Sequence, residues 1–400
     1  MEKFSFDYSK EVLKRDMHNA LLVLENGEVF EGISIGEQGF SCGEIVFNTS
    51  MFGYQEVLTD PSYTNQIITF TYPHIGNVGV NDQDQESESI WASGVIIRNP
   101  SLISSNWRAT GSLNDYLLKH KIIGIAGIDT RFLTQIIRDS GSQSACIMTT
   151  TKANKKEAFA CLDSFIKTNR GNLIPIVTTK KPYHWMEKNE YKKDCSRKDN
   201  TLFPYHIVVY DYGVKYSILR KLADLGCKIT VVPATTSPSQ LRTLSPDGVL
   251  LSNGPGDPKE SKEELQIIKE LIQNTDIPIF GICFGCQLIA LASNAQVNKM
   301  KFGHHGTNHP IKNLDTNRVY ITSQNHNYAV EKENLPDTLT VTHISLFDGT
   351  VQGVKRIDKP VWGFQGHPEA GPGPDDMEGC FQEFLLAVKL YFSSSNLKYA

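Results

Sequence analysis

The chain has 400 residues, of which 40% are hydrophobic and 21% are charged, and its formal net charge at pH 7 is −4. This length exceeds the size at which one hydrophobic core usually stops growing, so we expect two domains of an ordinary globular protein. The charge shows no basic surplus, which argues against nucleic acid as a partner because binding to phosphate backbones depends on Lys and Arg.

The apolar segments of the chain are short. The first residues contain no apolar core of the kind that a secretory signal needs, and no run elsewhere approaches the roughly 20 residues that cross a bilayer. We therefore expect a cytoplasmic protein without a membrane span. In that compartment the eight cysteines are better explained as reduced thiols than as a disulfide framework.

The N-terminal half begins with strand patterns. Residues 1–19 precede them as an extension, and ALLVLENGEVFEG then shows two alternating runs joined by Asn26-Gly27, a strong hairpin signal. Further strand-like runs (EIVFNTS, NQIITFTY, SGVIIRN, IIGIAGI) and helical patterns (LNDYLLKH, TRFLTQIIRD) follow between turn residues. This mixture predicts an α+β domain over residues 20–176.

The composition changes near residue 177. Residues 177–205 are rich in Lys and poor in aliphatic side chains, which is typical of a solvated linker without chemistry of its own. From His206 onward strand and helix patterns alternate: HIVVYDYG, KYSILRKLADLG, CKITVVPA and DGVLLSNGPGDP. This rhythm predicts an α/β domain over residues 206–394 with a mostly parallel sheet, helices on both faces and functional loops at the carboxyl ends of the strands.

One such loop carries the candidate nucleophile. The stretch IPIFGICFGCQLIALAS joins a strand to a helix through Gly281-x-Cys283-x-Gly285, and glycines two positions on either side of a nucleophile permit a sharp turn. At the start of the helix the dipole favours the thiolate of Cys283, and backbone N–H groups are available for an oxyanion. A buried structural cysteine also explains this pattern, so its partners decide between the two interpretations.

The partners are predicted near the C-terminus. In VWGFQGHPEAGPGP, His367 and Glu369 flank Pro368, which favours extended backbone in the residue before it. Residues two apart in an extended chain point the same way, so Glu369 can orient one imidazole nitrogen while the other faces a thiol. Cys283, His367 and Glu369 are therefore the candidate catalytic residues.

A third loop, LSNGPGDP, follows the strand pattern GVLL. Gly254 and Gly256 allow the backbone there to approach another group closely. The loop is either a plain turn or the source of an oxyanion-hole N–H on the side opposite Phe284.

These motifs carry a family resemblance over almost the whole chain. GICFGCQ, LSNGPGDP and GFQGHPE resemble the three signatures of class I glutamine amidotransferases, which use a catalytic triad. FNTSMFGYQEVLTDPSY, TYPHIGN and GIAGIDTR resemble the front domain of carbamoyl-phosphate synthetase small subunits, as do MKFGHHGTNHP, SQNHNYAV and SLFDGTVQG in the second half. The resemblance implies an α+β front domain followed by a class I amidotransferase-like α/β domain.

The same resemblance implies a role for each matching residue. Cys283 would be the nucleophile, His367 the general base and acid, and Glu369 the group that orients it. The residues expected to hold the substrate glutamine are Ser50, Gly254, Gly256, Phe284, Gln287, Asn325, Asn327 and Tyr328.

A partner follows from the resemblance as well. In this family ammonia passes through an internal tunnel to a large subunit, which uses ATP, bicarbonate and Mg²⁺ to make carbamoyl phosphate for arginine or pyrimidine synthesis. The sequence has no Gly-x-x-x-x-Gly-Lys-[Ser/Thr] phosphate loop. We expect a heterodimer in which this chain itself holds no cofactor and no metal.

Two positions depart from the family pattern. Asn327 replaces a Gly of the Asn-His-Gly-Phe loop, although Asn tolerates positive φ better than most residues. Cys286 replaces a His and creates Cys283-x-x-Cys286, which fits a redox pair, half a zinc site or a small buried side chain. Two other functions stay open: an amidotransferase or γ-glutamyl hydrolase of another pathway, and a catalytically silent scaffold.

Overall fold

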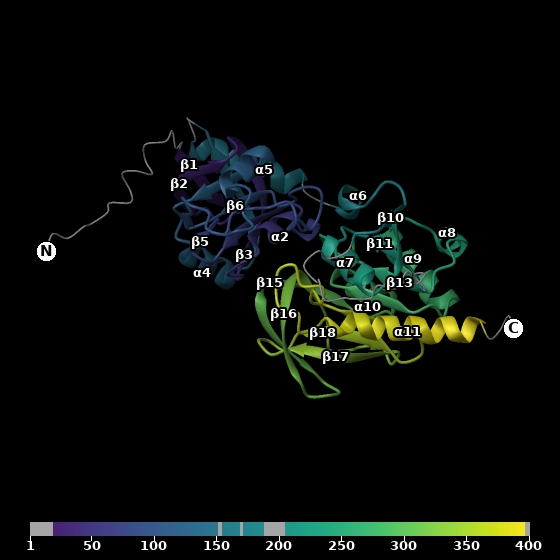
Figure 1. Cartoon of the computed structure of the whole chain (residues 1–400). Helices are drawn as coiled ribbons and strands as arrows, with labels where there is room; N and C mark the ends of the chain where they lie inside the picture. Colours follow the sequence, from purple (N-terminus) through teal and green to yellow (C-terminus); the bar gives the residue numbers. More distant parts are fainter. Residues whose placement is uncertain (1–18, 151–153, 169–170, 188–204, 397–400) are drawn as a thin grey trace. The chain divides into compact units, whose positions relative to one another are not determined.

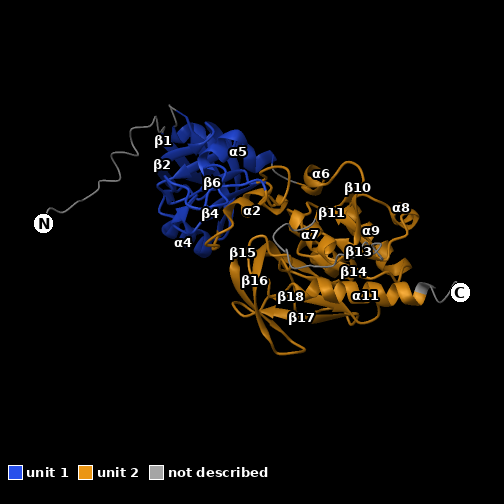
Figure 2. Ribbon diagram, viewed as in Figure 1, with its two compact units in different colours: residues 1–47, 65–82, 92–169 blue, residues 48–64, 83–91, 170–400 orange. Residues whose placement is uncertain are grey.

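A computed structural model describes residues 19–150, 154–168, 171–187 and 205–396 of the chain. They form two compact units, which Figure 2 shows in different colours. Unit 1 contains residues 1–47, 65–82 and 92–169, and unit 2 contains residues 48–64, 83–91 and 170–400. The predicted extension over residues 1–19 lies outside the described residues except for Asn19, which begins the first strand.

Figure 1 labels the main helices and strands of the chain. The described part of unit 1 is built on a closed sheet of seven strands. In their order around the sheet, the strands are β1 (Asn19–Leu24), β2 (Val29–Gly36), β8 (Ile123–Ala126), β6 (Gly94–Ile96), β4 (Gln66–Phe70), β3 (Gly39–Asn48) and β9 (Gln143–Thr149). β1 and β2 pair antiparallel across Asn26-Gly27, and Gly27 has a φ of 93°, so the predicted hairpin is confirmed. Because β6 pairs parallel with β4 and β8, the sheet is mixed.

Helices accompany this sheet, as the predicted α+β class requires. They are α3 (Leu113–Lys119), α4 (Thr130–Ser140) and α5 (Lys155–Thr168), and a small second sheet pairs β5 (His74–Ile75) with β7 (Asn99–Pro100). The side chains of Ser112 and Asp129 accept hydrogen bonds from backbone N–H groups in the first turns of α3 and α4. Closure of the sheet was not predicted from the sequence.

The described part of unit 2 contains a ten-stranded sheet. Its strand order is β10 (Tyr183–Trp185), β12 (Lys228–Pro233), β11 (His206–Asp211), β13 (Gly248–Leu251), β14 (Ile279–Ile282), β19 (Val361–Phe364), β18 (Val351–Arg356), β17 (Leu339–Ser345), β15 (Val297–Asn313) and β16 (Val319–Val330). The block from β12 to β19 is parallel.

The prediction of a mostly parallel sheet is wrong for the sheet as a whole. Strands β15 to β18 pair antiparallel with one another, β18 pairs antiparallel with β19, and β10 pairs antiparallel with β12. Parallel neighbours need a long crossover, whereas these antiparallel strands follow one another through short connections without helices. The sheet of unit 2 is therefore mixed, with a parallel block at its centre.

Helices cover both faces of the parallel block. They include α7 (Tyr216–Asp224), α8 (Pro238–Thr243), α9 (Lys262–Asn274), α10 (Phe284–Ala292) and α11 (Gly379–Asn396). Along β11 the side chains alternate between two apolar cores: Val208 and Tyr210 belong to one, and Ile207 and Val209 to the other. Burial on both faces explains why the strands of this block read as nearly continuous apolar runs.

Each unit is made of several segments that are not consecutive in the chain. Residues 48–64, with α2 (Tyr54–Thr59) and the short 3₁₀ helix η1 (Pro61–Tyr63), and residues 83–91 belong to unit 2 although they precede the linker. Part of the predicted linker is also structured, because α6 (Ile174–Val177) reaches its first residue and β10 forms an edge strand. Its residues 188–204 lie outside the described part, and the domain boundaries at 176 and 206 stay a prediction.

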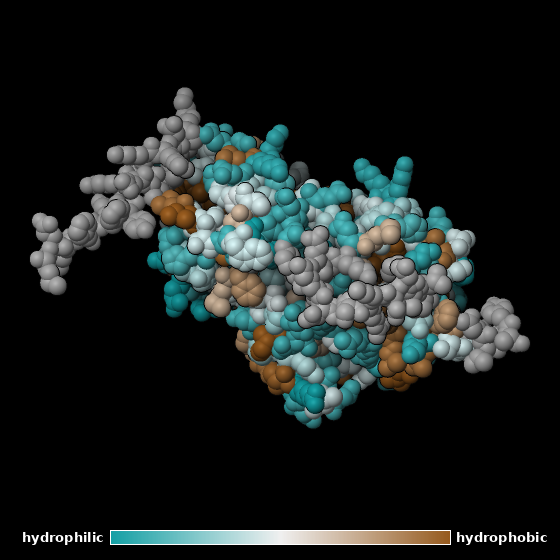
Figure 3. Space-filling model, in the orientation of Figure 1, coloured by the Kyte–Doolittle hydropathy of each residue, from teal (hydrophilic) through white to brown (hydrophobic). Residues whose placement is uncertain are grey.

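The visible face of the molecule is largely hydrophilic, with hydrophobic residues in separate patches (Figure 3). Within the described ranges, we find no helix with both the length and the apolar character that crossing a membrane requires.

Candidate active site

The strand-to-helix turn at Cys283 has the geometry that a nucleophile elbow needs. Cys283 lies between β14 and α10 with φ 53° and ψ −101°, an unusual conformation for a residue with a side chain. An ideal Cβ would lie 2.5 Å from the Gly285 carbonyl carbon if built on Gly281, and 2.3 Å from the Leu251 oxygen if built on Gly285. Neither glycine accepts a side chain without backbone movement, which is the steric reason for the sequence pattern.

The thiol of Cys283 is buried among backbone and amide groups. The backbone N–H of Cys283 donates to Phe364 O at 2.8 Å, which ties the elbow to the neighbouring strand β19. Sγ lies 3.4 Å from Asn325 O and 3.7 Å from Gln365 Nε2. Cys283 is only 2% exposed, so a substrate must reach it through a pocket.

His367 and Glu369 lie beside each other just beyond the end of β19. Nδ1 of His367 and Oε1 of Glu369 are 2.7 Å apart, and both side chains are almost fully buried. The backbone N–H of His367 donates to Ser323 O at 2.9 Å, which holds the residue against β16. Nε2 of His367 has no hydrogen-bond partner among the described residues and is therefore available to the reaction.

A buried lysine completes this arrangement. Lys215, at the start of α7, donates from Nζ to Glu369 Oε1 at 2.9 Å and to Ala370 O at 2.7 Å. Burial alone would raise the pKa of Glu369, but Lys215 and His367 lower it to about 2. Burial would likewise lower the pKa of His367, but the charge and the hydrogen bond of Glu369, together with the neighbouring Cys283, raise it to about 10. The carboxylate is therefore ionised and stabilises a protonated imidazole.

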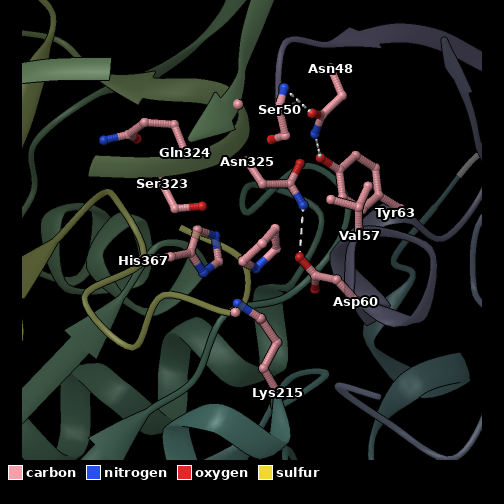
Figure 4. Close-up of a pocket in the computed structure, with 13 residues that line it drawn as sticks. Asn48, Ser50, Val57, Asp60, Tyr63, Lys215, Ser323, Gln324, Asn325 and His367 are labelled. Atoms are coloured by element: carbon pink, nitrogen blue, oxygen red, sulfur yellow. Dashed lines mark hydrogen bonds between the residues drawn. The ribbon is translucent and has the colours of Figure 1, made fainter. Parts of the chain in front are cut away.

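A small pocket opens beside His367 (Figure 4). All thirteen lining residues belong to unit 2: Asn48, Ser50, Val57, Asp60, Tyr63, Lys215, Gly306, Ser323, Gln324, Asn325, His367, Gly371 and Pro372. Ser50 is 2% exposed, and its Oγ has no hydrogen-bond partner among the described residues. Burying an unpaired hydroxyl is costly, so Ser50 Oγ is a candidate group for bonding a polar ligand in the pocket.

Two side-chain amides define the pocket wall. The backbone N–H of Ser50 donates to Asn48 Oδ1 at 2.8 Å, and Nδ2 of Asn48 donates to the Tyr63 hydroxyl at 2.8 Å. Nδ2 of Asn325 donates to Asp60 Oδ2 at 2.9 Å. These bonds fix the positions of Ser50 and Asn325 before any ligand arrives, which lowers the entropic cost of binding.

Comparison with known proteins identifies the family. The model of the carbamoyl-phosphate synthase small chain CPSase domain matches residues 22–147, and that of class I glutamine amidotransferases matches residues 208–387. The carbamoyl phosphate synthase small chain of Vibrio parahaemolyticus is 52% identical over 92% of this chain and 98% of its own. That of Salmonella typhi is 51% identical over 94% of this chain and 99% of its own.

The chain belongs to the carbamoyl-phosphate synthase small chain family. It is the glutamine-dependent small-chain component of such a synthase and carries a class I glutamine amidotransferase domain. A solved structure from Thermoplasma acidophilum, described as part of a GMP synthase, is 27% identical to this chain. The match covers 48% of this chain and 98% of that protein, with a TM-score of 0.43.

Other residues that the resemblance singles out in this small chain form a network next to the pocket. Nε2 of Gln287 donates to Tyr328 O at 2.9 Å and to Gln365 Oε1 at 3.2 Å. The ring nitrogens of His305 lie 2.9 Å from Asn325 Oδ1 and 2.9 Å from Asn327 Oδ1. Residues 325–328 lie within strand β16 rather than in a loop, and the side chain of Asn327 ties this strand to His305 of β15. Asn325 belongs to both the network and the pocket wall.

The loop after β13 approaches the elbow from the other side. Gly285 N donates to Ser252 O at 3.0 Å, an ideal Cβ on Gly254 would lie 2.4 Å from Tyr212 O, and Gly256 has a φ of 88°. The ring of Phe284 packs against that of Tyr212 at 5.7 Å. None of these glycines nor the Phe284 side chain lines the pocket, so among the predicted glutamine-binding residues only Ser50 and Asn325 do.

Cys286 lies in the apolar core beneath the elbow. It is 0% exposed, and an ideal Cβ on Gly363 would lie 2.8 Å from its Sγ. Burial raises its pKa, so the thiol stays protonated. Cys283 and Cys286 are free thiols, and no group of metal-type ligands occurs in the described part of the chain. The surroundings of Cys286 favour the small buried side chain over the redox and zinc interpretations.

Sequence reasoning missed several buried polar residues of this site. Lys215 directly follows the run HIVVYDYGV, and a lysine at the carboxyl end of a buried strand pattern was a signal that could have been used. Asp60 lies within the quoted motif FNTSMFGYQEVLTDPSY but was given no role. Nothing in the sequence pointed to Glu86, which lies in a polar stretch.

Proposed function

We propose that this small chain hydrolyses the side-chain amide of glutamine at Cys283, with His367 as acid and base and Glu369 as the orienting carboxylate. The observation that supports it best is the buried series Lys215, Glu369, His367 and Cys283, because two of its members, Lys215 and His367, line a pocket with an unpaired hydroxyl. This arrangement has the nucleophile, base and orienting group that acyl transfer needs.

The reactive form is a Cys283 thiolate beside a protonated His367, which holds the proton taken from the thiol. The thiolate attacks the amide carbon of glutamine, and the oxyanion is stabilised by backbone N–H groups at the start of α10 and in the loop with Gly254 and Gly256. His367 then donates its proton to the departing nitrogen. Ammonia is released, and the γ-glutamyl group stays bound to Cys283 as a thioester. His367 next removes a proton from water, which attacks the thioester and releases glutamate and the thiol.

The pocket offers polar groups for both ends of glutamine. Ser50 Oγ can bond a polar group of the substrate, and Asn325 and Asp60 are already fixed by their mutual hydrogen bond. We assign glutamine binding also to Phe284, Gln287, Asn327 and Tyr328, which hold the elbow and strand β16 beside it.

The ammonia is proposed to serve a large synthetase subunit. That subunit would consume ATP and bicarbonate, with Mg²⁺, to form carbamoyl phosphate in the cytoplasm, and the small chain itself would need no cofactor. The named relatives, which the chain matches over 98% and 99% of their length, are small chains of carbamoyl phosphate synthases, and this supports a large-subunit partner.

The test is to measure glutamate release and carbamoyl phosphate formation by the chain with a carbamoyl-phosphate synthase large subunit, ATP and bicarbonate. We expect Cys283→Ser to lower glutamine-dependent activity at least about a thousandfold while ammonia-dependent synthesis persists. Cys286→Ala is the matched control and should keep activity, since its thiol lies in the core.

The outcomes separate the parts of the proposal. Substantial glutamine use by Cys283→Ser would remove Cys283 from the mechanism. Glutamate release without carbamoyl phosphate would keep the glutaminase and reject the partner, and no glutamate release by the unmodified complex would favour a silent scaffold.

A further inference from the structure

The first turn of α7 is held by a residue from a distant part of the chain. A helix leaves its first N–H groups without partners inside the helix, and the N-cap residue Lys215 provides no side-chain hydrogen bond for them. Glu86 satisfies two of them. Its backbone oxygen accepts from Tyr216 N at 2.9 Å, and its carboxylate accepts from Ser217 N at 2.9 Å and from Ser217 Oγ at 2.6 Å.

Glu86 is itself buried and fixed. It is 2% exposed, and its backbone N–H donates to Thr59 Oγ1 at 2.9 Å. Burial raises the pKa of its carboxyl group, and the charges of Lys215 and Arg220, with the bonds from Ser217, act against this rise. An acidic group at the amino end of a nine-residue helix is also favoured by the helix dipole.

The same carboxylate touches the loop that follows Glu369. An ideal Cβ on Gly371 would lie 2.4 Å from Glu86 Oε1, so carboxylate and loop backbone are in direct contact. Lys215 links the two elements that Glu86 contacts. It begins α7, and its Nζ donates to Glu369 Oε1 and to Ala370 O in the loop. Glu86 therefore contacts both the helix that carries Lys215 and the loop that carries Glu369.

We propose that Glu86 is a positioning residue of the glutaminase site. It holds the first turn of α7 and the loop at Gly371 so that Lys215 keeps Glu369 and His367 aligned with Cys283. The inference rests on the proposed glutamine hydrolysis. It also gives residues 83–91 a role in unit 2, since they bring this carboxylate to a helix 131 residues further along the chain.

The experiment compares Glu86→Ala and Glu86→Gln in the complex with the large subunit. The number of active sites is counted by alkylation of Cys283 with iodoacetamide, followed by mass spectrometry of the peptide that contains it. For Glu86→Ala we expect kcat per active site for glutamine to fall about tenfold, or about 1.4 kcal/mol of barrier, with KM within about twofold. The matched control Glu88→Ala removes an exposed acid of the same segment and should change neither constant.

Glu86→Gln should recover most of kcat. Its amide oxygen can accept from Ser217 N, and its NH₂ group can donate to Ser217 Oγ, which preserves both contacts. If Glu86→Ala only lowered the thermal stability or the number of active sites, and kcat per site stayed unchanged, the residue would be a structural cap and the proposal would be wrong.

Two further measurements keep the test decisive. Should Glu86→Ala not fold, Ser217→Ala removes one donor to the carboxylate: a fall of about threefold in kcat per site would support the proposal, and an unchanged kcat would contradict it. Should the unmodified complex release no glutamate, the proposed function would fail. The alkylation rate of Cys283 would then still report on Glu86, with a slower rate in Glu86→Ala supporting the positioning role and an equal rate contradicting it.

Discussion

The two units bury different kinds of side chain. Among the described residues of unit 1, the buried polar side chains are three threonines, Thr69, Thr130 and Thr149, and none is charged. Unit 2 buries both acids and bases, among them Asp60, Glu86, Asp211, Lys215, Lys221, Glu264 and Glu369. Buried charges are expensive unless they are paired, so their concentration in unit 2 marks the part of the chain whose structure is selected for chemistry.

The difference also shows how the chain divides its tasks. Residues 48–64 and 83–91 leave the closed sheet of unit 1 and contribute Ser50, Asp60 and Glu86 to unit 2. An amidotransferase site assembled only from the C-terminal half would lack these groups. The front half of the chain therefore supplies both a largely apolar sheet and part of the polar surroundings of the triad.

The largest effect is expected where the buried charge network is broken. Lys215→Met keeps a chain of similar length but removes one of the two cations beside the buried carboxylate of Glu369. Breaking such a buried pair typically costs about 3–5 kcal/mol. We expect a lower melting temperature and a kcat for glutamine reduced by at least about a hundredfold. Thermal unfolding and glutamate release measure the two effects.

Lys221→Met is the control for that variant. Lys221 lies on the same helix and its side chain is 8% exposed, but its partners Asp375 and Glu378 are 65% and 34% exposed. Water can solvate these acids when the lysine is lost, so both effects should be much smaller. Equal losses in the two variants would show that the stability of α7, rather than the charge of Lys215, governs the site.

The sequence predicts the parts of the site that are local in the chain. Gly281, Cys283 and Gly285 define the elbow within five residues, and His367 and Glu369 are two apart, so spacing alone gives their geometry. The hairpin at Asn26-Gly27 is confirmed for the same reason. Each of these features depends on backbone conformation that the residues themselves determine.

The remaining features depend on contacts between distant residues. Lys215 meets Glu369 across 154 positions and Asn325 meets Asp60 across 265, and no periodicity reports such pairs. The antiparallel half of the sheet is marked in the sequence only by the end of the strand and helix alternation after α10, which the prediction of a mostly parallel sheet does not take into account. Closure of the sheet in unit 1 likewise follows from pairing between strands far apart in sequence, such as β1 with β9.

A core truncation in unit 1 should separate stability from catalysis. Leu22 is 0% exposed in β1, and Leu→Ala in such a position costs about 2–5 kcal/mol of unfolding free energy. Unit 1 buries no charged group among its described residues. We therefore expect kcat per active site, counted by alkylation of Cys283, to stay within about twofold of the unmodified value.

Leu251→Ala is the matched change in unit 2. Leu251 is equally buried, its backbone lies against Gly285, and the side-chain atoms that alanine lacks belong to the core that contains Phe284 and Cys286 of the elbow helix. A cavity of the same kind should therefore lower both stability and kcat. If Leu22→Ala lowered kcat as strongly, unit 1 would take part in catalysis and the contrast between the units would not hold.

The smallest expected effect is a difference in acid sensitivity between the units. Burial and the neighbouring His304 and His305 lower the pKa of His309 to about 3, although Asp348 acts in the opposite direction. Burial also lowers the pKa of His326 well below its usual value. In the unfolded chain these imidazoles titrate near pH 6.5, so below that pH the unfolded state binds more protons and the folded state loses stability.

This loss should amount to at most about 1.4 kcal/mol per pH unit for each histidine. Between pH 6.5 and about 4, hydrogen exchange followed by mass spectrometry should therefore show protection falling in β15 and β16 of unit 2 before it falls in β1 and β9 of unit 1. His309→Gln removes one of the titrating groups and should flatten this pH dependence. A simultaneous loss of protection in both units, unchanged by the variant, would show that the buried histidines do not set the acid sensitivity of unit 2.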